Sequence, residues 1–515
     1  MNVVGNLLIR ADGDSRIGTG HVMRMLALAE AWQAAGGNVT FASDNPTGNV
    51  RRRIEAAGAR FLPLRSRHPH PDDLADTRAF LGERQGGSSP PMWVALDGYH
   101  FDRGYQRAIR GTETRLLVLD DAVQQHYDAD VVLNQNLGVE RLPHACDGNT
   151  VLLLGTRYAL LRREFRRWRS FKRTIPETAR RLLVTLGGAD PKNVTLAVLK
   201  ALGLADLPDL EARVVVGMAN RNLKLLEEHV RSPAAIPPTV SVELLTNVAD
   251  MAELMAWADV AVGAGGTTCW ETAMMQLPAL VTVVADNQRV IADSLAEAQA
   301  LTHLGRADEL SPENIADALT LLCRDRGRRC RQAEIAQGLI DGRGSERVVA
   351  VMQSLDHPLP EDGMRLRPVA DDDAGPLWRL ANEPSVRAGS LSPEPFSWED
   401  HSAWYAEKRS SNDARIWVLD LHGVILGVIR YDRDGNGTAV ISLHVASPFR
   451  RRGLGTRLIE ETRQRVRDEL AVSRLKAVVR KENGPSLNTF LKNGFTRIAS
   501  ETIRQRPCHI LERAP

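Results

Sequence analysis

The stretch LLIRADGDSRIGTGHVMR, residues 7–24, decides the fold that we expect for the first part of the chain. Leu7–Ile9 is a short apolar run typical of a buried strand, and a helical pattern extends over Val22–Trp32. The glycine-rich segment GTGH, Gly18–His21, lies between them. Because the first N–H groups of a helix have no partner inside the helix, this loop is expected to direct them at an anion beside His21.

Strand-like and helical segments continue to alternate beyond this stretch. The next strand-like runs are Asn38–Ser43, Trp93–Leu96 and Arg115–Leu119, with a helical segment around Val50–Ala57. This alternation predicts a parallel, doubly wound α/β sheet. The pattern restarts with a second set of strand-like runs, at Arg181–Leu186, Arg213–Val216, Asp259–Val262 and Ala279–Val284. A second doubly wound domain is therefore expected, with a ligand cleft between the carboxyl ends of the two sheets.

The composition is that of a globular protein, and it argues against several functional classes. For 515 residues we expect about three domains of ~150 residues each. The 66 lysines and arginines nearly balance the 64 aspartates and glutamates, so no nucleic-acid partner is expected. The five cysteines form no CxxC pair, which argues against zinc and disulfides and fits a cytoplasmic protein. No apolar run approaches the ~20 residues of a membrane span, so no membrane insertion is expected.

A basic segment with interleaved aromatic residues, RREFRRWRSFKR, spans Arg162–Arg173. Leu161, Phe165, Trp168 and Lys172 fall at helical spacing. We therefore interpret the segment as a helix with a buried aromatic stripe and a solvated arginine face. The alternative is a site for an anionic ligand or partner, which the near-neutral charge of the chain does not favour.

His21 is the candidate catalytic base. A typical histidine lies at the surface or caps a helix. His21, however, is in a glycine-rich strand-to-helix turn, where its side chain can project into the cleft. Since the ordinary pKa of histidine is about 6.5, this side chain is suited to take a proton from water or a hydroxyl group.

Glycine-rich loops of the second domain are candidates for binding a diphosphate. The segment GAGGTTCWE offers loop amides, threonine hydroxyls and a helix dipole, all of which favour an anion. Its candidate residues are Gly265, Gly266, Thr267 and Glu271, the last for the ribose hydroxyls. Gly187 and Gly188, after the first strand of the same domain, add a second set of amides. The alternative for GAGGTT is a tight turn whose threonine caps a helix.

Six motifs carry a resemblance to a known family. They are RADGDSRIGTGHVMR (10–24), ALDGYHFD (95–102), LLGTRYALLRREF (153–165), VTLGGADPKN (184–193), VGAGGTTCWE (262–271) and ADNQ (285–288). Over residues 7 to about 350 the chain resembles the UDP-sugar hydrolases of pseudaminic acid biosynthesis. That family is similar to glycosyltransferases of the GT-B fold, but it transfers the sugar to water.

The resemblance implies inverting hydrolysis of UDP-2,4-diacetamido-2,4,6-trideoxy-β-L-altropyranose to UDP and the free sugar. It makes His21 the general base, with Gly18 and Gly20 shaping its loop. It places Tyr99, Asn287 and Gln288 on the substrate side, and the glycine loops of the second domain on UDP.

Carboxylates near these motifs have weaker assignments. Asp12 and Asp97 are candidates for orienting the base or the sugar. Asp120 and Asp121 are adjacent, but neighbours on a strand point to opposite faces, so we interpret them as a strand end followed by a turn. No metal is expected.

The tail begins afresh at Met364, after the proline-containing linker Leu355–Gly363. It contains GTAVISLHVASPFRRRGLGTRLIEETRQRV (437–466) and ENGPSLNTFLKNGF (482–495). These segments resemble a GNAT N-acetyltransferase. The resemblance implies an α+β domain with acetyl-CoA as cosubstrate.

In the GNAT family the RxxGxG pattern places backbone amides on the pyrophosphate of acetyl-CoA. The residues that the resemblance assigns to this cofactor are Leu443, Val445, Arg450, Arg451, Arg452, Gly453, Leu454, Gly455, Thr456 and Asn483. Leu443–Val445 line the acetyl group, Thr456 opens the helix, and Asn483 lies near the pantetheine arm. The alternative for RRRGLG alone is a basic turn before a helix. Phe490 stands where many members have a tyrosine that protonates the CoA thiolate, and His444 and Tyr431 are the candidate substitutes.

The expected organisation has four parts. Residues 1–175 and 176–354 form the two GT-B-like halves, 355–363 the linker and 364–515 the GNAT domain. Together the resemblances imply one bifunctional enzyme. Its GNAT domain acetylates the 4-amino group of a UDP-4-amino-4,6-dideoxy-N-acetyl-altrosamine, and its front half hydrolyses the product. The expected partners are the UDP-linked amino sugar, acetyl-CoA and other enzymes of the pathway.

Two alternatives stay open at this point. One keeps both activities but acts on a legionaminate- or bacillosamine-type nucleotide sugar, because loops that bind UDP and CoA scarcely constrain the sugar. The other joins a nucleotide-sugar-binding module without turnover to a protein N-acetyltransferase.

Overall fold

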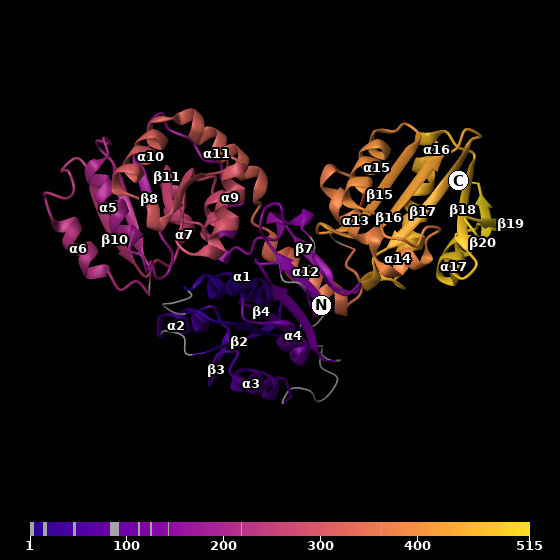
Figure 1. Cartoon of the computed structure of the whole chain (residues 1–515), viewed down its shortest axis with the longest axis horizontal. Helices are drawn as coiled ribbons and strands as arrows, with labels where there is room; N and C mark the ends of the chain where they lie inside the picture. The colour runs from indigo at the N-terminus through magenta and orange to yellow at the C-terminus, as the bar shows by residue number, and fades with distance from the viewer. Residues whose placement is uncertain are drawn as a thin grey trace. The chain divides into compact units, whose positions relative to one another are not determined.

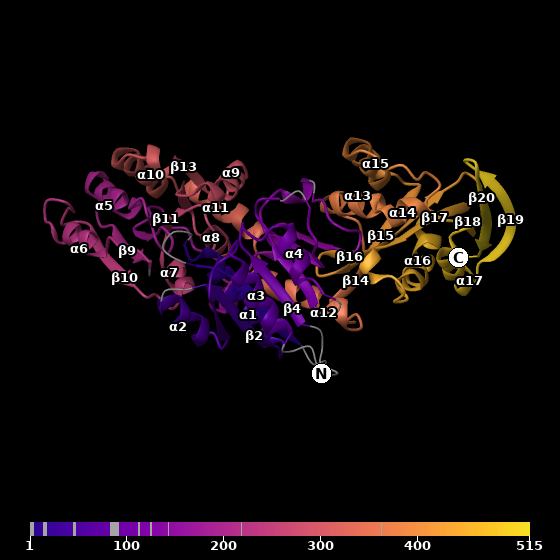
Figure 2. The ribbon, with the colours of Figure 1, turned by 60° about the horizontal axis from the view of Figure 1, so that its bottom comes forward.

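The computed structural model describes residues 5–13, 18–44, 48–82, 92–111, 114–123, 126–142, 144–217, 219–361 and 363–514. The chain divides into two compact units, residues 1–146 with 152–349 and residues 147–151 with 350–515. The first unit contains two parallel sheets flanked by helices, and the second a mostly antiparallel sheet (Figure 1, Figure 2). The predicted fold class, two doubly wound α/β domains followed by an α+β domain, is confirmed.

The first sheet has the strand order β3-β2-β1-β4-β5-β6-β7, and its described pairings are parallel. Its strands are β1 (Asn6–Ala11), β2 (Asn38–Asp44), β3 (Arg60–Leu64), β4 (Met92–Asp97), β5 (Thr114–Leu119), β6 (Val131–Asn134) and β7 (Val151–Leu154). Its helices are α1 (Gly20–Ala34), α2 (Gly48–Ala56), α3 (Pro71–Gly82) and α4 (Arg103–Ile109). The strand order reverses between β1 and β4, so ligands are expected beyond the carboxyl ends of these two strands.

The second sheet has the order β10-β9-β8-β11-β12-β13 and is also parallel. Its strands are β8 (Arg181–Thr185), β9 (Glu211–Val216), β10 (Ser241–Thr246), β11 (Val260–Ala264), β12 (Ala279–Val283) and β13 (Thr302–Arg306). The helices are α5 (Val194–Leu204), α6 (Leu223–Arg231), α7 (Met251–Trp257), α8 (Thr268–Met274), α9 (Arg289–Glu297), α10 (Pro312–Arg324), α11 (Arg326–Leu339) and α12 (Gly344–Asp356). Here the order reverses between β8 and β11, the two strands that precede the glycine-rich loops. Helix α12 continues through the first two residues of the expected linker.

The sheet of the second unit has the order β14-β15-β16-β17-β18-β20-β19. Its strands are β14 (Met364–Pro368), β15 (Ala414–Leu421), β16 (Val424–Arg433), β17 (Thr438–Val445), β18 (Arg474–Arg480), β19 (Thr496–Ile503) and β20 (Arg506–Arg513). Its helices are α13 (Ala374–Asn382), α14 (Pro384–Gly389), α15 (Trp398–Ser410), α16 (Leu454–Leu470) and α17 (Gly484–Lys492). β17 and β18 pair in parallel, whereas the other pairings are antiparallel.

The prediction of a helix over Arg162–Arg173 is wrong. The structure has only a short 3₁₀ helix, η3 (Arg163–Trp168), followed by an irregular segment. Phe165 is buried and Arg163 and Arg167 are exposed, as expected, but Arg162 is buried. Arg162 pairs with Glu271 at 2.8 Å, and Arg173 donates to the Met275 carbonyl oxygen at 2.9 Å. These tertiary contacts of the arginines fix an irregular backbone that the spacing of the aromatic residues did not reveal.

Buried charges tie the first sheet to α3. Arg10 on β1 and Asp73 on α3 have no exposed side-chain surface, and Arg10 Nε donates to Asp73 Oδ2 at 3.1 Å. Asp73 Oδ1 also accepts the Tyr105 hydroxyl hydrogen at 2.6 Å, while Arg10 pairs with Asp12 at 2.7 Å. These hydrogen bonds connect the strand to the helix and give each buried charge an oppositely charged partner.

We expect Asp73→Ala to lower the free energy of unfolding of the first unit by ~3–5 kcal/mol, because the buried guanidinium loses its main partner. Urea unfolding followed by hydrogen exchange of the backbone amides in the first sheet measures this loss. Asp76→Ala is the matched control, since Asp76 lies on the same helix but pairs with the exposed Arg65. A surface pair of this kind contributes little, so equal losses for the two variants would contradict the prediction.

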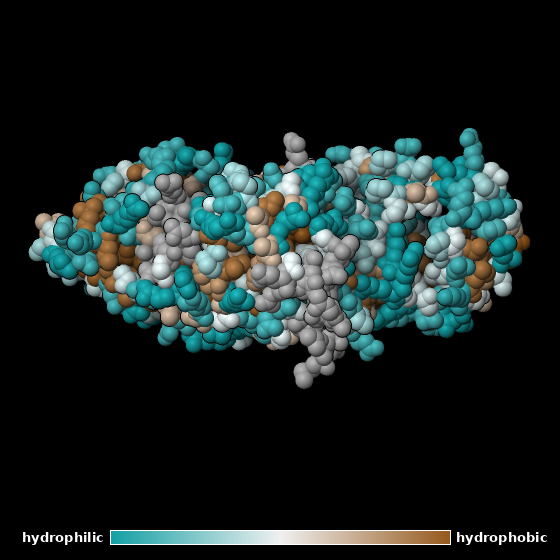
Figure 3. Space-filling view, turned by 90° about the horizontal axis from the view of Figure 1, so that it is seen from below, coloured by the Kyte–Doolittle hydropathy of each residue, from teal (hydrophilic) through white to brown (hydrophobic). Residues whose placement is uncertain are grey.

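Polar side chains dominate the face of the molecule seen in Figure 3, where apolar residues form small groups among them. Among the described residues, no helix combines the length and the apolarity that a membrane crossing needs. All five cysteines are free thiols.

Candidate functional site

The GTGH loop brings His21 to the carboxyl end of β4. Gly18 has a left-handed backbone with φ of +78°, and α1 begins two residues later, so His21 lies in the first turn of the helix. Asp97 is the last residue of β4 and is fully buried. His21 Nδ1 lies 2.7 Å from Asp97 Oδ1, and the His21 side chain is 11% exposed. A carboxylate at Nδ1 leaves Nε2 as the nitrogen available to accept a proton.

Arg24 and Asp121 extend this contact. Arg24 lies three residues after His21 on α1 and contacts both oxygens of Asp97 at 2.6 Å. It also binds Asp121 Oδ2 at 2.5 Å. Burial alone would raise the pKa of Asp97, but the charge of Arg24, followed by that of His21, lowers it to about 2. Asp97 is therefore a carboxylate throughout the physiological pH range.

Tyr99 and Asn287 meet beside the histidine. Asn287 Nδ2 donates to the Tyr99 hydroxyl oxygen at 3.1 Å, which joins the loop after β4 to the segment after β12. The rings of Tyr99 and His21 are edge to face, with 5.2 Å between their centroids. Burial, and then the charge of Asp121, raise the pKa of Tyr99 to about 12. The structure thus brings together three residues that the resemblance placed at the substrate.

The glycine loops of both halves also converge. A Cβ atom on Gly188 would lie 2.5 Å from Thr19 Oγ1, so the loop after β8 packs directly on the GTGH loop. A Cβ atom on Gly265 would lie 3.1 Å from the carbonyl oxygen of Gln288. A side chain at either position would collide with these atoms, so glycine permits the close approach.

The loop after β11 leads into α8. Thr267 is the residue before this helix and makes no capping hydrogen bond through its side chain, contrary to the capped-turn alternative. Glu271 lies in the first turn of α8, and its Oε1 accepts hydrogen bonds from Arg162 at 2.8 and 3.1 Å. The Glu271 carboxylate is therefore held in place by a buried arginine.

Asp12 makes its hydrogen bonds to a different set of residues. Its Oδ1 accepts hydrogen bonds from Arg10 at 2.7 Å, from Ser43 at 3.1 Å and from the Asp44 amide at 2.9 Å. Of the two candidate carboxylates, Asp97 orients His21, and Asp12 belongs to the buried Arg10 group.

The interpretation of Asp120 and Asp121 as a strand end holds, because β5 ends at Leu119. That interpretation did not foresee the contact of the Asp121 side chain with Arg24. Arg24 was also missed, although its position three residues after His21 puts both on one helix face.

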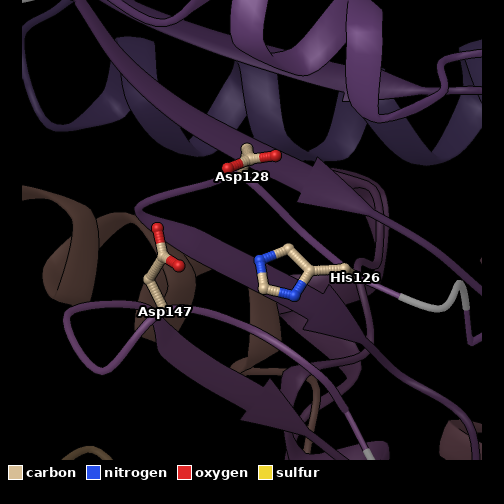
Figure 4. Close-up of side chains that lie close together, drawn as sticks. All are labelled: His126, Asp128 and Asp147. Carbon is tan, nitrogen blue, oxygen red and sulfur yellow. The ribbon is translucent and has the colours of Figure 1, made fainter.

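One group of possible metal ligands occurs among the described residues. His126, Asp128 and Asp147 have ligand atoms within 4.8 Å of one another, as Figure 4 shows. Asp128 is already paired with Arg103 at 2.5 Å and with Arg107 at 3.0 Å. We assign no metal to this group.

The second unit contains a cavity of about 1400 Å³ beside β17. The pairing of β17 with β18 ends at Ile441 and Ala477, although both strands continue beyond these residues. The strands thus separate and leave backbone groups of β17 open toward the cavity. Nine of the ten residues expected at acetyl-CoA line it: Leu443, Val445, Arg450, Arg451, Gly453, Leu454, Gly455, Thr456 and Asn483.

The loop before α16 has two left-handed residues. Arg451 has φ of +63° and Gly453 φ of +78°. Strained backbone of this kind forms concavities lined by N–H groups that bind anions, and α16 adds its N-terminal amides. Helix α16 begins at Leu454, two residues before Thr456.

Arg452 points elsewhere. Its side chain donates to the carbonyl oxygens of Ser354, Leu355 and His357 at the end of α12. Its guanidinium therefore anchors α12 and does not line the cavity of β17.

The two substitutes for the missing tyrosine differ in position. The Tyr431 hydroxyl lies 2.8 Å from Thr462 Oγ1 on α16, and burial raises its pKa. His444 lines the cavity, where burial and then the charge of Arg430 lower its pKa to about 4. His444 is therefore uncharged at neutral pH, and it is the candidate that can reach a substrate. Phe490 packs against Phe495, with 5.1 Å between ring centroids.

Basic side chains outnumber acidic ones around the cavity. Arg430 lies over the Trp404 ring at 4.9 Å, and Arg387 over the Phe396 ring at 5.0 Å. Among the described lining residues, six are arginine or lysine and two are acidic. Sites for one small ligand usually measure ~300–1,000 Å³, so this cavity has room for a second, anionic ligand beside a CoA.

Comparisons with known proteins agree with this architecture. The model of the glycosyltransferase family 28 C-terminal domain matches residues 182–343, and that of the GNAT acetyltransferase domain matches residues 364–496. The crystal structure of MurG from Acinetobacter baumannii aligns with a TM-score of 0.50 and 19% identity, covering 68% of this chain and 99% of MurG.

Two curated relatives extend the comparison. An uncharacterised protein of Methanocaldococcus jannaschii is 22% identical over 427 residues, with 80% of each chain covered. The spore coat polysaccharide biosynthesis protein SpsG of Bacillus subtilis is 30% identical over 228 residues, 44% of this chain and 65% of SpsG. The chain thus joins a GT-B-like module, similar to MurG and SpsG, to a GNAT acetyltransferase domain.

Proposed function

We propose that the protein is a bifunctional nucleotide-sugar enzyme of pseudaminic acid biosynthesis. Residues 1–354 hydrolyse UDP-2,4-diacetamido-2,4,6-trideoxy-β-L-altropyranose, and residues 364–515, joined by the linker 355–363, make this compound from the 4-amino precursor and acetyl-CoA. The observation that carries the proposal is the contact of His21 with Asp97, because a module that only binds a sugar has no need of an oriented base.

In the hydrolytic step, a water oxygen attacks the anomeric carbon as the bond from that carbon to the UDP oxygen breaks. His21 Nε2 takes the proton of the water, and UDP leaves with the bonding electron pair. The converging glycine loops supply amides for the negative charge that develops on the diphosphate. Attack from the side opposite UDP inverts the anomeric centre.

In the acetyl transfer, the 4-amino nitrogen attacks the thioester carbon, and the bond from this carbon to sulfur breaks. The nitrogen loses a proton and the CoA thiolate gains one. We assign the transfer of this proton to His444, which lines the cavity and is uncharged at neutral pH. The loop from Arg450 to Thr456 holds the pyrophosphate of acetyl-CoA, and Asn483 lies near the pantetheine arm.

The excess of basic over acidic lining residues supports an acceptor that still carries its nucleotide. A free amino sugar offers no anion for the basic side chains that line the cavity, whereas a UDP-linked sugar offers a diphosphate. Arg430 is already paired with Asp432 at 2.7 Å, so Arg387 is the cation outside the loop that we assign to this diphosphate. The similarity to a polysaccharide biosynthesis protein also supports a sugar substrate. Acetylation is then the first step and hydrolysis the second.

Supplying the full-length protein with the UDP-linked 4-amino sugar, with and without acetyl-CoA, tests the proposal. We expect free thiol to appear first and UDP to follow, and neither product to form without acetyl-CoA. Thiol release without UDP would leave the front half as a binding module. Release of neither product would overturn the pathway assignment, and thiol release on peptides would favour a protein N-acetyltransferase.

A further inference from the structure

Two buried groups beyond Asp97 determine the charge around His21. The Arg24 guanidinium holds Asp97 in two-point contact, with Nε on Oδ2 and Nη2 on Oδ1, each at 2.6 Å. Arg24 Nη2 also lies 3.2 Å from His21 Nδ1. A bidentate arginine fixes both the position and the plane of a carboxylate. The orientation of Asp97, and with it that of the imidazole, therefore depends on Arg24.

Asp121 adds a second carboxylate on the far side of Arg24. Arg24 Nη1 contacts Asp121 Oδ2 at 2.5 Å, and the side chains of Arg24 and Asp121 are 4% and 8% exposed. With both carboxylates ionised, the group of Asp97, Arg24 and Asp121 carries two negative charges and one positive charge. One negative charge is left uncompensated beside a neutral His21, and it is balanced when His21 takes a proton.

We propose that Arg24 and Asp121 are positioning residues of the catalytic base: Arg24 fixes Asp97 against His21, and Asp121 supplies the negative charge that stabilises His21 in its protonated form. The inference rests on the proposed hydrolysis, in which His21 holds the proton of water after the attack. Charges act strongly in such a buried setting, because little water screens them.

The other groups that face His21 keep their charge as the pH changes. Asp97, at the end of β4, has a pKa of about 2, and Tyr99, in the loop after β4, has one of about 12. The Tyr99 hydroxyl lies 3.4 Å from Asp121 Oδ2 and accepts a hydrogen bond from Asn287, which does not titrate. Arg24, on the same helix as His21, stays protonated. A shift in the titration of His21 in a variant therefore reports on the altered neighbour.

Variants at the two positions should move the pH dependence in opposite directions. Asp121→Asn removes a negative charge, so His21 binds its proton less tightly. The acid limb of kcat/KM then moves to lower pH by about one unit or more, and the plateau rate falls because the base is weaker.

Arg24→Met removes the positive charge, so the acid limb moves to higher pH and the rate recovers as the pH rises. Arg24→Lys keeps the positive charge but loses the two-point contact with Asp97. It should lower the rate with little shift of the acid limb.

Glu30→Gln is the matched control. Glu30 is a carboxylate on the same helix, about 13 Å further along its axis, and it accepts a hydrogen bond from the Arg163 amide at 2.8 Å. Neutralising Glu30 removes one negative charge from α1 without touching the Arg24 group. We expect the acid limb to stay where it is.

NMR titration of the His21 ring in the full-length protein without substrate provides the second readout, with His21→Gln identifying the resonance. It does not depend on turnover or on the stability of any single variant. Unchanged His21 titration in both Asp121→Asn and Arg24→Met, or a rate loss equal at every pH, would overturn the inference. If the wild-type protein released no UDP, the proposed function would fail while the titration still tested the charge group.

Discussion

His21→Ala should lower the rate of UDP release by ~10²- to 10⁴-fold, the range that a positioned general base contributes. Water is a weak nucleophile, so its attack depends on a base that takes its proton. Asp97 holds Nδ1 at 2.7 Å, so the variant removes the Nε2 acceptor and leaves the carboxylate bound to Arg24. Steady-state release of UDP from the diacetamido nucleotide sugar measures the loss.

The same protein contains the control. Acetyl transfer belongs to the second unit and should keep its rate in His21→Ala, which shows that the loss is confined to the first unit. Binding of UDP, measured by calorimetry, should also persist, because the glycine loops and Glu271 are untouched. Hydrolysis within a few-fold of the wild-type rate would show that His21 is not the base.

The sequence was informative where function depends on local backbone. GTGH, GGADPKN and RRRGLG each follow a strand, and a glycine-rich strand-to-helix turn permits few arrangements. Gly18 and Gly453 have the left-handed backbone that such turns require. The alternation of elements likewise fixed the doubly wound class, because parallel strands need helical crossovers.

Side chains that meet across the fold were harder to predict. Asp121 reaches Arg24 across 97 positions of sequence, and Asn287 reaches Tyr99 across 188. The first pair depends on how the segment after β5 lies against α1, and the second on how the segment after β12 meets the loop after β4. No periodicity in the sequence encodes either arrangement. The prediction of a helix over Arg162–Arg173 was wrong for the same reason. The arginines of this segment bind carbonyl oxygens and a carboxylate that lie about 80 or more positions away in the sequence.

The acetyltransferase residues show where a motif stops being informative. RRRGLG predicts three similar arginines, yet the structure gives them three roles. Arg450 Nε donates to the Val445 carbonyl oxygen at 2.9 Å and so braces the loop against the end of β17. Arg451 takes the left-handed backbone, and Arg452 anchors α12. Their common side chain therefore matters less than the position of each residue along the turn.

Gly453→Val should raise the KM for acetyl-CoA by about tenfold or more, because a left-handed backbone costs an L residue ~1–2 kcal/mol and a β-branched residue more. No atom lies within 4 Å of the position a Cβ would take on Gly453, so the penalty comes from the backbone at φ of +78°. The turn relieves the strain by rotating, and its amides then leave the positions that face the pyrophosphate. Hydrolysis of the already acetylated nucleotide sugar should keep the wild-type rate.

Gly437→Val separates the loss of binding from the loss of stability. Gly437 also has a left-handed backbone, with φ of +70°, but it lies in the hairpin between β16 and β17 and does not line the cavity. The two variants carry similar strain within the same sheet domain. If the turn amides hold the cofactor, only Gly453→Val weakens acetyl-CoA binding, and both lower the melting temperature of the second unit. Equal loss of acetyl-CoA affinity in the two variants would mean that the loop matters for folding alone.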